Sequence, residues 1–84
     1  MPKRKIPEIP EEVVSKMKEI GIKVKKLRQQ TVDGKNYKDF ASGHGLNSMT
    51  VWRIENGIDS RLSSLLNVLK ELGISPEEFF KGIK

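Results

Sequence analysis

Residues 37–57 read YKDFASGHGLNSMTVWRIENG, and the order of residue types in this stretch decides the fold. Capping residues and glycines divide it into two short helices. Asn36 suits the N-cap of the first helix, expected over residues 37–43, because its side chain accepts a backbone N–H. Gly45 suits the tight turn that follows, because glycine tolerates a positive φ.

The second helix of the stretch is expected to begin at Asn47 or Ser48 and to run to about Glu55, with Asn56–Gly57 ending it. Apolar residues at helical spacing predict the buried side of the pair. This inward set is Phe40, Ala41, Leu46, Val51 and Ile54. The outer face of the second helix is then left to Ser48, Met49, Trp52 and Arg53. A helix face of this kind is able to enter the major groove of DNA, which is about 12 Å wide.

The flanking sequence predicts three more helices, which makes the fold all-α with five helices. Apolar residues recur at spacings of three and four along residues 11–30, and Gly21 permits a bend within that extended first helix. A leucine-rich helix over residues 62–72 is expected to stop at Gly73. Ser-Pro-Glu-Glu opens the last helix over residues 75–80.

Length and composition indicate one small domain. Residues 1–10 hold three of the four prolines and a basic run, so we expect a flexible basic arm there and a single domain over residues 11–84. The chain has no cysteine, which excludes disulfides and thiolate metal sites. No apolar run approaches the roughly 18–20 residues that span a bilayer, so we expect a cytoplasmic protein without membrane association.

The net charge of +5 is concentrated at the N-terminal end. Residues 1–30 contain nine Lys or Arg against four Glu, whereas residues 31–60 sum to −1 and residues 61–84 to +1. This distribution suits a polyanionic partner such as nucleic acid, and the alternative is a solvated lysine face. On the first interpretation, the arm would join four side chains in facing phosphates, namely Lys23, Lys25, Lys26 and Arg28.

Catalysis is not expected from this sequence. His44 is the single histidine, it has no cysteine to share a metal site with, and we interpret it as a partly buried turn residue. No nucleophile–base pair and no phosphate-binding loop is visible. The sequence therefore favours a binding protein without cofactor or metal over an enzyme.

Residues 27–80 resemble the Cro and phage-repressor type of helix-turn-helix domain, also called lambda-repressor-like or XRE family. The matching segments are Asp39–Ala41, Gly45–Asn47, Val51–Gly57, Leu62–Leu66, Leu72–Ile74 and Ser75–Phe80. The run Arg53–Gly57 is the most diagnostic of them. The resemblance implies a five-helix lambda-repressor-like domain whose third helix reads bases, with the helix-turn-helix motif at about residues 37–56.

The resemblance also implies which residues contact DNA. Base edges would be touched by Asn47, Ser48, Met49, Trp52 and Arg53. Tyr37 stands where the family usually has a phosphate-binding glutamine, and Asn56 and the loop to Arg61 lie where it touches backbone phosphates. His44 replaces the usual leucine, and Ser60 replaces a common proline. The outer face of this base-contacting helix holds one guanidinium and no glutamine, so these side chains do not predict which DNA sequence is bound.

These features predict a sequence-specific DNA-binding transcriptional regulator, in the form of a homodimeric repressor on a pseudo-palindromic operator. Two candidate dimer surfaces are open, namely the fourth and fifth helices or the extended first helix. Trp52 suits either DNA or a partner subunit. The alternatives are an antitoxin- or controller-type regulator that mainly holds a protein partner, and an interaction module that has lost DNA binding. The −1 charge of residues 31–60 favours the second alternative.

Overall fold

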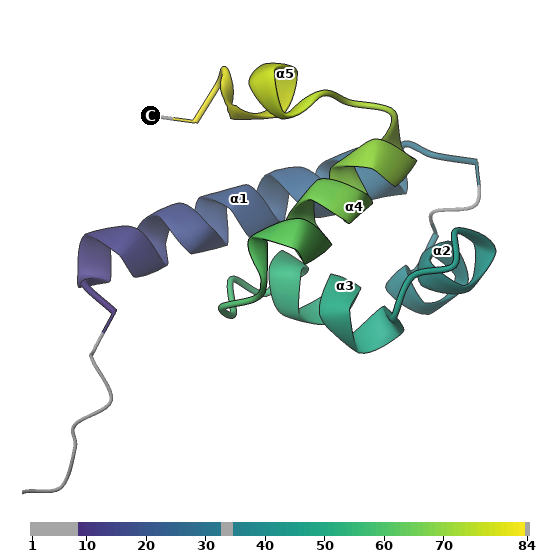
Figure 1. The fold of residues 1–84 in the computed structure, drawn as a ribbon, viewed down its shortest axis with the longest axis horizontal. Helices are drawn as coiled ribbons and strands as arrows, with labels where there is room; N and C mark the ends of the chain where they lie inside the picture. The colour runs from purple at the N-terminus through teal and green to yellow at the C-terminus, as the bar shows by residue number, and fades with distance from the viewer. Residues whose placement is uncertain (1–8, 33–34, 84) are drawn as a thin grey trace, which may run out of the picture.

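Five helices form the framework of the computed structural model, which describes residues 9–32 and 35–83. In chain order they are α1 (Glu11–Gln29), α2 (Tyr37–Gly43), α3 (Ser48–Glu55), α4 (Leu62–Leu72) and α5 (Pro76–Phe80) (Figure 1). No strand occurs in these two ranges, so the prediction of an all-α, five-helix chain is confirmed. Most of the basic arm predicted over residues 1–10, and the turn at 33–34, lie outside the described residues.

The ends of the short helices lie at the capping residues that the sequence predicts. Asn36, Asn47 and Ser75 each accept a backbone N–H from the first turn of α2, α3 and α5, respectively. Gly57 follows the end of α3 with φ +72°, and Gly73 caps α4 with φ +74°. Both glycines hold the left-handed conformation that other residues avoid, so the chain leaves these helices where glycine permits it.

Gly21 does not bend α1, which runs as one helix of 19 residues. Its backbone instead lies close against the C-terminal end of α3. A Cβ atom at Gly21 would lie 2.5 Å from the carbonyl oxygen of Ile54 and 2.6 Å from that of Glu55. The glycine is therefore required for helix packing, and the possible bend is not found.

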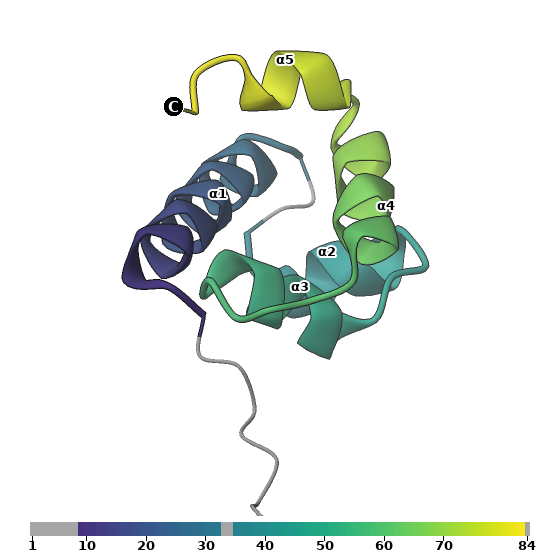
Figure 2. The same ribbon diagram turned by 60° about the vertical axis from the view of Figure 1, so that its left-hand side comes forward.

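The core lies between α1, the α2–α3 pair and α4, and α5 covers one end of it. Figures 1 and 2 show α5 at the end of the molecule away from α2 and α3. The buried side chains are Val24, Phe40, Ala41, Val51, Ile54, Val68, Leu69 and Phe79. All four of Phe40, Ala41, Val51 and Ile54 were predicted to face inward, while Leu46 is partly buried against this core.

Two polar contacts attach α1 to its neighbours. Arg28 and Glu55 form a double hydrogen bond, with Nε–Oε2 at 2.6 Å and Nη2–Oε1 at 3.0 Å, and their side chains are only 4% and 5% exposed. Lys23 donates to the carbonyl oxygen of Phe79, and its ammonium lies 5.0 Å from the centre of that ring. These contacts tie α1 to the end of α3 and to α5. None of the helices in the described ranges is long and apolar enough to cross a bilayer.

Candidate nucleic-acid interface

The outward face of α3 combines two apolar side chains with one cation. Val51 and Ile54 are buried in the core, which turns the opposite face of this helix to solvent. On that face Met49 is 52% exposed, Trp52 is 36% exposed and Arg53 is exposed. Side chains three and four positions apart on a helix are neighbours, so Met49, Trp52 and Arg53 form one continuous surface. Ser48 is half-buried beside it.

The asparagines at the two ends of α3 are partly engaged by the helix itself. The Asn47 side-chain oxygen accepts from the backbone N–H groups of Met49 and Thr50, at 2.9 and 3.2 Å. The Asn56 amide donates to the carbonyl oxygen of Trp52 at 2.8 Å. Each amide group has two N–H hydrogens, so Asn47 keeps its donors and Asn56 keeps one donor for an external acceptor.

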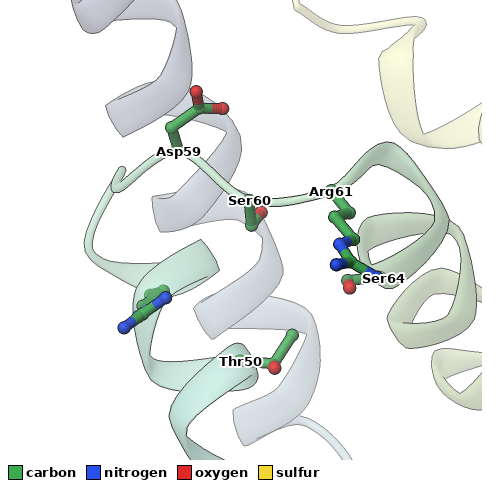
Figure 3. A pocket seen from close by; sticks show the side chains of 6 residues that line it. Thr50, Asp59, Ser60, Arg61 and Ser64 are labelled. Carbon is green, nitrogen blue, oxygen red and sulfur yellow. The ribbon is translucent and has the colours of Figure 1, made fainter.

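A hollow of about 530 Å³ lies between α3, the α3–α4 loop and the first turn of α4. Its lining consists of Thr50, Arg53, Asp59, Ser60, Arg61 and Ser64. In Figure 3 the Arg61 side chain extends beside Ser64, with Thr50 across from them on α3, and the Asp59 carboxylate points away from these groups. The hollow therefore presents hydroxyl groups and a guanidinium toward one space.

The charge balance of this hollow is positive. It holds the two guanidinium groups of Arg53 and Arg61 and the single carboxylate of Asp59. Within residues 9–32 and 35–83, neither guanidinium lies within ion-pair distance of a carboxylate. Both arginines are exposed, so their charge and their N–H donors face the solvent. An anion with several acceptor oxygens, such as a phosphate, satisfies such donors.

A second, smaller hollow adjoins the first along the α3–α4 junction, and Leu46, Val51 and Val68 form its apolar part. It measures about 200 Å³, and its lining includes Asn47 and Asn67. Thr50 and Ser64 line both hollows. The two hollows are thus joined at these two hydroxyl groups.

The structure brings together only some of the residues predicted to contact DNA. Met49, Trp52 and Arg53 share the exposed face of α3, and Arg61 joins Arg53 at the larger hollow. Tyr37 is half-buried at the start of α2, where its ring packs against the core.

Two hydroxyl residues of the larger hollow were not predicted, namely Thr50 and Ser64, whereas Ser60 lies in the loop to Arg61 that was expected near backbone phosphates. For Thr50 the available signal was its position three residues before Arg53 on the same helix. For Ser64 the available signal was its position in the first turn of α4, three residues after Arg61.

The structure corrects the set of basic residues expected to face phosphates. Arg28 is 3% exposed and bonded to Glu55, and Lys23 is held against Phe79. Neither side chain is available to a phosphate in this arrangement. Lys25 and Lys26 are exposed. The expectation failed for Arg28 because it lies four positions after Val24, which places both side chains on the buried face of α1.

His44 lies in the turn between α2 and α3 and is partly buried, as predicted. Its Nδ1 lies 2.9 Å from Glu71 Oε1, and its ring lies 4.4 Å from the Phe40 ring, centre to centre. These contacts place the imidazole between the turn and α4, where it links the two elements.

Comparison of the chain with protein-family models, with curated proteins and with solved structures finds no match.

Proposed function

We propose that this chain binds double-stranded DNA as a sequence-specific regulator of the Cro and phage-repressor type, with α3 lying in the major groove. The observation that carries the proposal is the position of the Arg53–Arg61 hollow directly beside the exposed face of α3. A helix that reads base edges needs phosphate contacts next to it, because these contacts fix its register on the duplex.

We assign different contacts to the hollow and to the exposed face of α3, according to the side chains that each presents. Arg61 stands at the N-cap of α4, and we assign it to a backbone phosphate together with the Ser64 hydroxyl. Arg53 projects from α3 itself, and we assign it to a guanine edge, where a guanidinium bonds O6 and N7 together. Asn47, Ser48, Asn56 and Tyr37 remain proposed polar contacts around this centre.

A homodimer on a pseudo-palindromic site is part of the proposal. One α3 covers only a few base pairs, and two copies would present their reading helices about 34 Å apart. An apolar groove of about 310 Å³ between the N-terminal half of α1 and the start of α4 is one candidate contact surface, lined among others by Val13, Met17, Ile58 and Leu62. The other candidate surface is the end of α4 with α5, where Phe80 is 37% exposed.

The test is selection of bound duplexes from a random 30-base-pair pool, followed by salt titration of the selected site. Arg61→Ala is expected to weaken binding to all sequences alike and to reduce the slope of log K against log salt by about 0.9. Arg53→Ala is expected to cost roughly 1–3 kcal/mol and to relax preference at one base pair. Lys81→Ala, at the C-cap of α5, removes the same charge and is the matched control, because α5 lies away from α3 (Figure 1).

Three outcomes would contradict parts of this proposal. If micromolar protein shows no salt-dependent binding to any duplex, the exposed apolar surfaces point to a protein partner instead. If Arg53→Ala binds every sequence as well as the unmodified chain does, its assignment to a base edge is wrong. If the selected DNA does not contain two half-sites spaced one helical turn apart, the proposed homodimer is wrong.

A further inference from the structure

The exposed face of α3 is unusual for a base-reading surface because its two largest side chains are apolar. Met49 and Trp52 lie one turn apart and leave 52% and 36% of their surfaces exposed. Arg53 beside them carries the one charge on this part of the helix. The asparagine groups at both ends of α3 are partly used in bonds to the helix backbone. Most of the area that faces outward is therefore suited to apolar contact.

The edges of the base pairs offer few apolar groups to such a surface. In the major groove guanine, cytosine and adenine present donors and acceptors, whereas thymine adds a methyl group at C5. A methionine sulfur is only a weak acceptor, and an indole has a single N–H donor. Met49 and Trp52 are thus poorly equipped to distinguish bases by hydrogen bonds. They are well equipped to cover a methyl group and exclude water from it.

On the basis of the proposed DNA-binding function, we infer that Met49 and Trp52 are specificity residues that read C5-methyl groups of pyrimidines. The ligand feature is thymine, and 5-methylcytosine carries the same group at the same atom. Arg61 beside this surface attracts the phosphate backbone that brings the base edges to it. The positive hollow adjoining the apolar face favours DNA over an uncharged protein surface as the occupant.

The experiment compares duplexes that differ only in methyl groups. The site selected from the random pool is synthesised with thymine, and then with deoxyuridine replacing one thymine at a time. Each contacted methyl is expected to change the dissociation constant about fourfold, which is the effect of burying one methyl or methylene group. The losses should be confined to a few adjacent positions in each half-site. A second pair of duplexes carries cytosine or 5-methylcytosine in place of thymine at one of those positions. The duplex with 5-methylcytosine should bind more tightly than the duplex with cytosine.

Variants assign the effect to the two side chains. Met49→Gln and Trp52→Ala should each lose the thymine preference at the positions that the replaced side chain covers, while Met49→Leu should keep the preference because it keeps an apolar surface. Arg61→Ala is the matched control, since it should weaken both duplexes by the same factor and leave their ratio unchanged. Circular dichroism of each variant establishes that the helices are retained.

The outcomes separate this inference from the function on which it rests. Equal binding of the two duplexes by the unmodified chain, with sequence preference and salt dependence intact, would overturn methyl reading and leave DNA binding standing. A thymine preference that survives both Met49→Gln and Trp52→Ala would overturn the assignment to these residues. Failure to bind any duplex would overturn both proposals.

Discussion

Replacing Glu55 with alanine tests how strongly α1 is held to the end of α3. Arg28 donates to both carboxylate oxygens of Glu55, and neither side chain is more than 5% exposed. The substitution removes the carboxylate that accepts both of these hydrogen bonds from the buried guanidinium. Breaking one side of a buried ion pair typically costs 3–5 kcal/mol, so we expect a loss of about 3–5 kcal/mol in the free energy of unfolding.

The size of this loss is large relative to the whole domain. Native proteins are stable by about 0.05–0.15 kcal/mol per residue, so a chain of 84 residues has roughly 4–13 kcal/mol in total. For domains of this length, each kcal/mol moves the melting temperature by about 4–8 °C. We therefore expect Glu55→Ala to lower the melting temperature by more than about 12 °C, or to prevent folding.

Urea unfolding followed by circular dichroism at 222 nm measures the change, and the chain supplies its own control. Lys16 and Glu19 form an ion pair at 3.6 Å with side chains 49% and 50% exposed. Because water screens such a pair, Glu19→Ala should cost less than about 1 kcal/mol. The double variant Arg28→Met, Glu55→Leu should recover most of the loss, since it removes both buried charges.

A result in which Glu55→Ala costs no more than Glu19→Ala would refute this reasoning. It would mean that water or a rearranged neighbour compensates the guanidinium, so that the pair does not hold α1 to α3. If the double variant is as unstable as Glu55→Ala alone, the loss of stability comes from altered packing and not from the broken ion pair.

Two further predictions concern single residues of the helix framework. Gly21→Ala should destabilise the protein by about 1–3 kcal/mol in thermal unfolding, although alanine favours helices, because its Cβ would meet the Ile54 carbonyl oxygen. The control Gly82→Ala should be nearly neutral in the same measurement. Equal losses of stability in Gly21→Ala and Gly82→Ala would contradict the close approach of α1 to α3 at Gly21. Asn47→Ala should cost about 1 kcal/mol through the lost cap. Asn47→Asp should keep the cap yet weaken DNA binding in the salt titration, and unchanged binding would remove Asn47 from the interface.

The helix boundaries could be predicted from sequence because the signals for them are local. Asn36, Asn47 and Ser75 cap the helix that immediately follows each of them, and Gly73 ends the helix before it. Such features depend on a few neighbouring residues. The buried and exposed faces of α3 follow from helical periodicity in the same way, which is why Met49, Trp52 and Arg53 could be placed on its outer side.

Features that depend on packing between distant segments were not predictable in this way. Charge counts include Arg28 among the available cations, and only the position of Glu55 in space shows that this charge is neutralised inside the protein. Likewise, helix propensity marks Gly21 as a weak point, whereas the backbone of α3 makes it a packing requirement. Thr50 and Ser64 come together only because α4 folds back beside α3.

The contact of α1 with α3 at Gly21 also determines when the exposed face of α3 is formed at all. α3 has eight residues, and isolated helices shorter than about 12–15 residues are marginal in water. Its conformation therefore depends on a helix that begins more than thirty residues earlier in the chain. The surface forms and is lost together with the cooperative unit of the whole domain. The fraction of chains able to bind a ligand there equals the folded fraction. The unfolded chains that cannot bind are the same chains that proteases cleave.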